Sequence, residues 1–169
     1  YWQVQAFDLR VVGSPMMASG LIFASCGSGG TGKRTVAVRP GDIEGEQPAE
    51  IAYDVKGSLP YVPVPVAYEE KDLVFIWSDH GIVQCLDAPS GEVHWKERVG
   101  GQFFGSPVRV GERLYCISRE GTVFVLAAAD EYELLGKVDL GEPSNSSPAV
   151  ADGVMYLRTV SHLMALEGR

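Results

Sequence analysis

The 169 residues are 46% apolar and 21% charged, which suits one folded domain with a buried core and argues against a disordered chain. The formal net charge of −8 weighs against a nucleic-acid partner, because phosphate binding depends on clustered Lys and Arg. No apolar run approaches the roughly 20 residues that a membrane-spanning helix needs, so we expect no membrane insertion.

One short pattern occurs four times along the chain. Each copy opens with a proline at the head of an apolar run: Pro15, Pro65, Pro107 and Pro148. Successive prolines are 50, 42 and 41 residues apart, a period typical of propellers and solenoids. A second run in each copy carries an aromatic residue in one register: Phe23, Phe75, Tyr115 and Tyr156. A third run carries an aliphatic residue in register: Val38, Leu86, Leu126 and Leu166.

The third copy shows most clearly how one repeat is built. Its apolar runs lie at 107–110, 114–117 and 122–126, and a more polar run follows at 132–140. Glycine-containing turns separate the first three runs, which is typical of antiparallel hairpins, and no window has the apolar spacing of a long helix. A β-sandwich would also suit short strands, but it would not explain the strict period. We therefore predict an all-β propeller of four-stranded antiparallel blades, about four of them in this chain.

The repeat register divides residues 1–169 into one partial propeller whose first and last units are incomplete. Trp2 lies 13 residues before Pro15, much as Trp95 lies 12 residues before Pro107, so we expect a fourth strand from Trp2 to Asp8. The expected units are an outer strand of a preceding or closing blade at 1–10, blades at 11–57, 58–100 and 101–141, and a blade without its outer strand at 142–169.

Two arrangements would account for these incomplete units. The strand from Trp2 to Asp8 could complete a last blade, closing a four-bladed ring within one chain or an eight-bladed ring across two chains. Alternatively, the chain is a fragment of a longer propeller of seven or eight blades, which we favour. Either way, we expect the outermost strands to pair, and a homodimer through open propeller edges is one form of that pairing. We also expect the four register aromatics to pack between adjacent sheets.

The second copy contains a more specific motif between Cys85 and Trp95, with the sequence CLDAPSGEVHW. It resembles the tryptophan-docking motif of quinoprotein-like propellers, Ala-x-Asp-x-x-Thr-Gly-x-x-x-Trp. Asp87 and Ser90 are expected to bond turn amides, Gly91 to adopt a positive φ, and Trp95 to wedge between neighbouring sheets.

The other copies depart from this motif. The third copy has Leu135 where the docking tryptophan is expected, and the first has a long acidic loop there. The resemblance therefore speaks for the fold more than for an activity.

The segment from Gly27 to Arg34, GSGGTGKR, matches two glycine-rich phosphate-binding patterns. Both patterns need a helix to follow, so that its first amides face the phosphate. The run that follows, from Thr35 to Val38, instead has the composition of a strand. We therefore interpret the segment as a hairpin loop rather than a nucleotide site.

The remaining chemistry-bearing residues form no recognisable catalytic motif. The three cysteines are widely separated and are expected to be buried thiols: Cys26, Cys85 and Cys116. The three histidines are expected at turns or strand ends, and no nucleophile motif accompanies Asp79 and His80: His80, His94 and His162. Asn145–Ser147 is a formal glycosylation sequon that we interpret as structural. We assign no catalytic, cofactor-binding or metal residue.

The resemblance leads us to expect a non-catalytic propeller that acts as a protein-binding or assembly scaffold for an unidentified partner. It also implies a periplasmic or cell-surface location. One alternative is a segment of a dehydrogenase that uses pyrroloquinoline quinone and calcium, whose relatives hold the quinone with an adjacent-cysteine disulfide, an Asp base and Glu and Asn ligands. In that case the cofactor site would lie in blades outside this chain, which lacks a Cys-Cys pair. Another alternative is a ligand-binding sensor propeller. We expect no cofactor in this chain.

Overall fold

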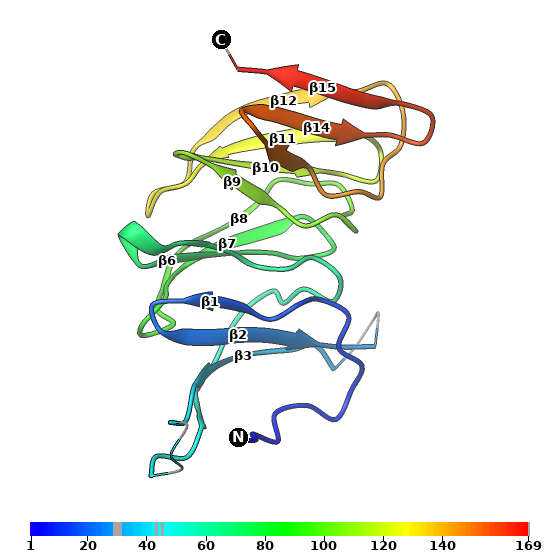
Figure 1. The fold of residues 1–169 in the computed structure, drawn as a ribbon. Coiled ribbons are helices and arrows are strands. Elements are labelled where there is room, and N and C mark those ends of the chain that lie inside the picture. Colours follow the sequence, from blue (N-terminus) through cyan, green and yellow to red (C-terminus); the bar gives the residue numbers. More distant parts are fainter. Residues whose placement is uncertain (29–31, 43, 45, 169) are drawn as a thin grey trace.

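The computed structural model describes residues 1–28, 32–42, 44 and 46–168, and these form four antiparallel sheets (Figure 1). The first sheet holds β1 (Met16–Ala18), β2 (Leu21–Cys26), β3 (Arg34–Arg39) and β4 (Glu50–Asp54). The second holds β5 (Val66–Tyr68), β6 (Leu73–Trp77), β7 (Ile82–Asp87) and β8 (Val93–Arg98). The third holds β9 (Val108–Val110), β10 (Arg113–Ile117), β11 (Thr122–Ala127) and β12 (Leu134–Asp139). The fourth holds β13 (Ala149–Ala151), β14 (Val154–Arg158) and β15 (Leu163–Glu167).

Every sheet is a meander, in which strands that are neighbours in sequence are also neighbours in space. A short 3-10 turn, η1 (Glu69–Lys71), is inserted between β5 and β6. The sheets follow one another in a row, with the N-terminal segment at one end and β15 at the other (Figure 1). This arrangement confirms the predicted all-β propeller architecture. Among the described residues, no helix is long and apolar enough to cross a membrane.

The repeat register of the sequence is also the register of the sheets. Each register aromatic lies on the second strand of its sheet, opposite the first residue of the first strand: Phe23 opposite Met16, Phe75 opposite Val66, Tyr115 opposite Val108 and Tyr156 opposite Ala149. The side chains of one strand alternate between the two faces of the sheet. Residues in equivalent positions therefore face the same direction along the row.

Apolar side chains fill the space between successive sheets. Phe23 belongs to a cluster between the first and second sheets, and Phe75 belongs to one between the second and third. Tyr115 packs against a smaller cluster between the third and fourth sheets, whose fully buried members are Ile117, Val123 and Leu157. Each register aromatic thus faces the sheet that follows it.

The fourth aromatic does not meet the expectation that all four pack between sheets. Phe23 and Phe75 are 0% exposed, whereas Tyr156 is 36% exposed. The physical reason is its direction: Tyr156 faces away from the third sheet, and the described residues place no further sheet on that side.

The N-terminal segment also differs from the prediction. We expected a strand from Trp2 to Asp8, but these residues join no sheet in the structure. Instead, the segment lies over the outer face of the first sheet, where the Arg34 guanidinium donates a hydrogen bond to the carbonyl of Ala6. The pairing of its edge with β15 is not seen within the chain, because the two lie at opposite ends of the row (Figure 1).

The register aromatics provide a matched test of this packing. We expect Phe75→Ala to lower the free energy of unfolding by about 3–5 kcal/mol, because it empties a closed interface. Tyr156→Ala removes an aromatic at the equivalent position from an open face, so it should cost less than about 1 kcal/mol. Urea unfolding of both variants measures the difference. Equal costs would show that the register does not govern the packing.

Candidate functional site

The docking motif has the geometry that its sequence predicts. Trp95 is 8% exposed, and its indole Nε1 donates a 2.9 Å hydrogen bond to the carbonyl of Ala129 beside the next sheet. The turn before it is held by Asp87, whose carboxylate accepts hydrogen bonds from the amide and the hydroxyl of Ser90 at 2.9 and 2.5 Å. Those bonds lower the pKa of the Asp87 carboxyl. Gly91 completes the turn with φ +76°.

Sequence analysis missed a second docking aromatic, Tyr53 on β4. Tyr53 lies opposite Ala37, just as Trp95 lies opposite Cys85 one sheet later. Its hydroxyl donates to the carbonyl of Ala88 in the next sheet, and burial raises the pKa of that phenol well above its usual range. The acidic loop before β4 shifts Tyr53 along the sequence, so only strand pairing reveals the equivalence.

In the third sheet the docking position is empty. We predicted that Leu135 occupies it, but β12 has an irregularity in register, and Gly136 is the residue that lies opposite Val125. Leu135 falls one residue short of that position and is 43% exposed. The third sheet therefore brings no aromatic side chain from its outer strand to the fourth.

Serines along the inner loops join the sheets in a directed series. The amide of Val64 donates to the hydroxyl of Ser106 at 2.9 Å, and the amide of Ser106 donates to the hydroxyl of Ser147 at 2.8 Å. These residues each precede a repeat proline, so the motif Ser-Pro supplies an acceptor to the sheet before it. Gly105 allows the close approach, because a Cβ there would lie 2.3 Å from the carbonyl oxygen of Ser146.

Polar side chains at the loop ends connect sheets rather than form a reaction centre. The Asp79 carboxylate pairs with Lys33 at 2.7 Å and accepts hydrogen bonds from the amides of Tyr61 and Val62. These partners use its oxygens, so Asp79 and His80 do not form a catalytic pair. Lys33 in turn belongs to the glycine-rich segment, which leads into β3 rather than a helix. Residues 29–31 of that segment lie outside the described residues.

The formal sequon is also part of an inter-sheet contact. The Arg119 side chain donates to the Asn145 side chain at 3.3 Å and to Gln102 at 3.4 Å. Its guanidinium also lies 4.4 Å from the ring centre of Phe104. Asn145 therefore contributes to the contact between the third and fourth sheets.

A carboxylate at the same end of the molecule holds the β14–β15 turn. Glu142 accepts a 2.6 Å hydrogen bond from the Ser161 hydroxyl and a 2.7 Å hydrogen bond from the Thr159 hydroxyl. The His162 ring nitrogen Nδ1 lies 3.0 Å from the same carboxylate. The hydrogen bonds from Ser161, Thr159 and His162 lower the pKa of Glu142 to about 2.

The structure does not assemble a quinone or metal site from the residues it describes. The cysteines Cys26, Cys85 and Cys116 are buried and separate, and burial raises the pKa of the Cys85 thiol to about 12. Within the described ranges, no three His, Cys, Asp or Glu side chains are grouped to hold a metal ion. The buried polar atoms without partners, Trp77 Nε1 and Gln84 Oε1, belong to strands of one sheet but to opposite faces, so they do not converge on a ligand. The residues present do not fit the quinone.

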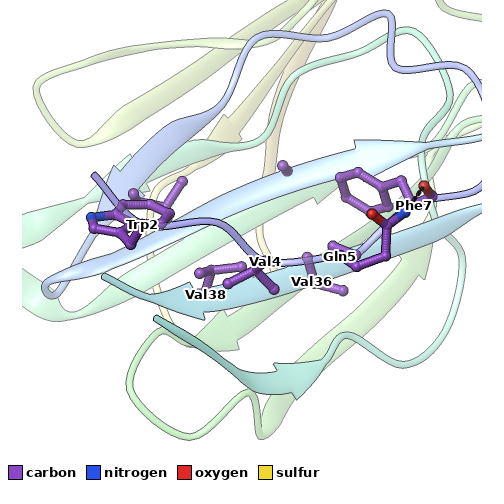
Figure 2. Close-up of a pocket in the computed structure, with 9 residues that line it drawn as sticks. Trp2, Val4, Gln5, Phe7, Val36 and Val38 are labelled. Carbon is purple, nitrogen blue, oxygen red and sulfur yellow. Dashed lines mark hydrogen bonds between the residues drawn. The ribbon is translucent and has the colours of Figure 1, made fainter. Parts of the chain in front are cut away.

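The row of sheets instead ends in two apolar faces, which form the candidate functional site. At one end, Val36 and Val38 face away from the second sheet and are covered by the N-terminal segment (Figure 2). Trp2 lines the same hollow of about 290 Å³ beside Val38, whose register mate Leu126 packs in the cluster of Trp95. Trp2 thus lies on this face as Trp95 lies on the third sheet.

The opposite end is open. Tyr156 and Leu163 lie on the outer side of the fourth sheet, and Leu163 is 72% exposed. The β15 strand pairs only with β14 among the described residues, so its other edge carries free amides and carbonyls. Such an edge is a template for pairing with another strand.

The Glu142 contacts predict a pH dependence. A folded pKa near 2 lies below the ordinary value of 4.5, so the stabilisation is present above about pH 4.5 and is lost as the pH falls toward 2. We expect Glu142→Gln to lower the melting temperature at pH 7, and the difference from the unchanged protein to shrink between pH 4.5 and 2. Thermal unfolding across that range measures it. A difference that stays constant at low pH would contradict this role.

Comparisons with known proteins agree with the repeat type. A family model described as outer membrane protein assembly factor BamB matches residues 62–134, which confirms the resemblance to quinoprotein-like repeats. No curated protein matches the chain.

Solved structures share the fold at low sequence identity. BamB from Moraxella catarrhalis has a TM-score of 0.64 and 14% identity, over 90% of this chain and 41% of that chain. A europium-containing methanol dehydrogenase has a TM-score of 0.59 and 14% identity, over 76% of this chain and 25% of that chain. The computationally designed Ika4 protein has a TM-score of 0.70 and 12% identity, over 98% of this chain and 95% of that chain. This chain therefore spans less than half the length of the first two.

Proposed function

We propose that this chain, whose repeats belong to the PQQ-repeat propeller family, is a non-catalytic scaffold that binds protein through the two apolar faces at the ends of its row of sheets. A periplasmic or cell-surface location is part of the proposal. It is supported by the family model, whose description is that of an outer membrane protein assembly factor.

The observation that carries the proposal is that the two end faces hold the same devices that join the sheets inside the chain. Tyr156 stands on one end in the register of Phe75, and Trp2 stands on the other where a docking tryptophan would lie. Ser147 and Ser14 occupy the two terminal places of the inner serine series. These faces are therefore complementary to each other in the same way as two neighbouring sheets.

The finer form of the proposal names a second copy of this chain as one partner. The outer face of the fourth sheet would meet the face of the first sheet in the other copy. There, the N-terminal segment of the second copy already lies over its own first sheet, within reach of a neighbouring β15 edge. It would complete the three-stranded sheet by strand addition, in keeping with the designed protein of about the same length that shares the fold.

Light scattering of the purified chain tests this form. We expect a mass of twice 18.2 kDa at high concentration. Leu163→Glu should shift the protein to the monomer, because it places a charge in the closed interface. Leu135→Glu puts the same charge at an exposed position on β12, away from both end faces, and should leave the dimer intact.

Two neighbouring prolines then test strand addition itself. Consecutive amides of a strand point to opposite sides, so only one of Val4→Pro and Gln5→Pro should remove a ladder hydrogen bond and weaken the dimer. If both or neither weaken it, the segment does not pair as a strand. A chain that stays monomeric at all concentrations defeats the second-copy form.

A quinone-dependent dehydrogenase is the second candidate, favoured by the structural likeness to the methanol dehydrogenase. Its test adds pyrroloquinoline quinone and calcium, with methanol and a redox dye, to this chain and to the full gene product. We expect neither saturable quinone binding nor dye reduction. Stoichiometric binding with dye reduction would replace the scaffold proposal with an oxidoreductase.

A further inference from the structure

The contact between the third and fourth sheets lacks a side chain that the two preceding contacts contain. Tyr53 reaches from the first sheet to the second, and Trp95 reaches from the second to the third. Gly136 holds the equivalent place in the third sheet. A Cβ at Gly136 would have no neighbour within 4 Å, so the space beside it is open.

A hollow of about 380 Å³ lies between these sheets, where the missing side chain would be. It is lined by Tyr115, Met155 and Leu166, among others. Gly136 lies in one cross-strand row with Val125 and Tyr115, and both of these pack toward the fourth sheet. A side chain at Gly136 would therefore rise from the row that lines the hollow.

The lining residues are the register mates of residues that surround Trp95. Tyr115 corresponds to Phe75, and Leu166 corresponds to Leu126 in the cluster of Trp95. Leu126 is 0% exposed, whereas Leu166 is 50% exposed. The third contact thus has an apolar lining built for an aromatic ring, with the ring absent.

Two charged residues at this hollow indicate what kind of ring it would bind. Arg113 lines one side and Glu167 the other. Elsewhere in the chain a guanidinium lies over a ring, that of Arg109 at 4.0 Å from the ring centre of Tyr68. A carboxylate can accept a hydrogen bond from an indole N–H, as the carbonyl of Ala129 does from Trp95. The chemistry favours an electron-rich aromatic ring with a hydrogen-bond donor.

We propose that the hollow between the third and fourth sheets binds a tryptophan side chain of a partner polypeptide, which takes the place that Trp95 occupies in the preceding contact. The inference rests on the proposed protein-binding function and names the chemistry of the segment that is bound. The site is separate from the two end faces, so it can be tested in the Leu163→Glu background, where the end-face contact is removed.

The experiment titrates N-acetyl-tryptophanamide, and a short tryptophan-containing peptide, against the chain with labelled methionine methyl groups. We expect a saturable shift of the Met155 methyl resonance, with a smaller response to N-acetyl-alaninamide. Gly136→Trp should fill the hollow from within, weaken binding at least tenfold and raise the melting temperature. Gly136→Ala adds only a methyl group and should preserve binding.

Other outcomes overturn the proposal. They are no saturable shift of Met155, or binding that is unchanged in Gly136→Trp. If Gly136→Trp does not fold, Leu166→Glu serves as the blocking variant, and unchanged binding there has the same meaning. Loss of indole binding without any change in the end-face dimer would refute this site and leave the proposed function standing.

Discussion

The structure depends on packing between sheets, because no single sheet can bury both of its faces. Every sheet is a narrow meander with apolar side chains on either side, and it becomes stable only when another sheet covers each face. Phe23 and Phe75 achieve this from the second strand, and Tyr53 and Trp95 add a second ring from the fourth. Two rings from one sheet therefore meet each following sheet, and a polar anchor on each outer ring fixes how the sheets are aligned.

Polar contacts at the loop ends set the spacing that the rings require. Asp79 connects the first two sheets through Lys33 and two amides, and Arg119 connects the last two through Asn145. Each uses a charged group to satisfy backbone or side-chain partners on a different sheet. Their number and position explain why the titratable residues of this chain are structural: the groups with partners are already occupied with holding sheets together.

The fold could be predicted from the sequence, since the repeat prolines and the register aromatics recur with one period. The motif from Cys85 to Trp95 could be predicted as well, because its turn chemistry is local. Two features could not. Tyr53 is displaced by the loop before β4, and Gly136 is hidden by the register irregularity in β12, so both emerge only from strand pairing. The course of Trp2 was also missed, because its position depends on contacts with the first sheet rather than on its own sequence.

The inner serine series has a direction, since the amide of each member donates to the hydroxyl of the next. A surface built on that series can meet only the opposite end of another such surface, not its own mirror partner. Association through these ends is therefore heterologous, and nothing in a single contact limits how many chains join. Only the rotation from one sheet to the next decides whether growth stops in a closed ring. A substitution that changed this rotation by a small angle would convert a finite assembly into an open filament.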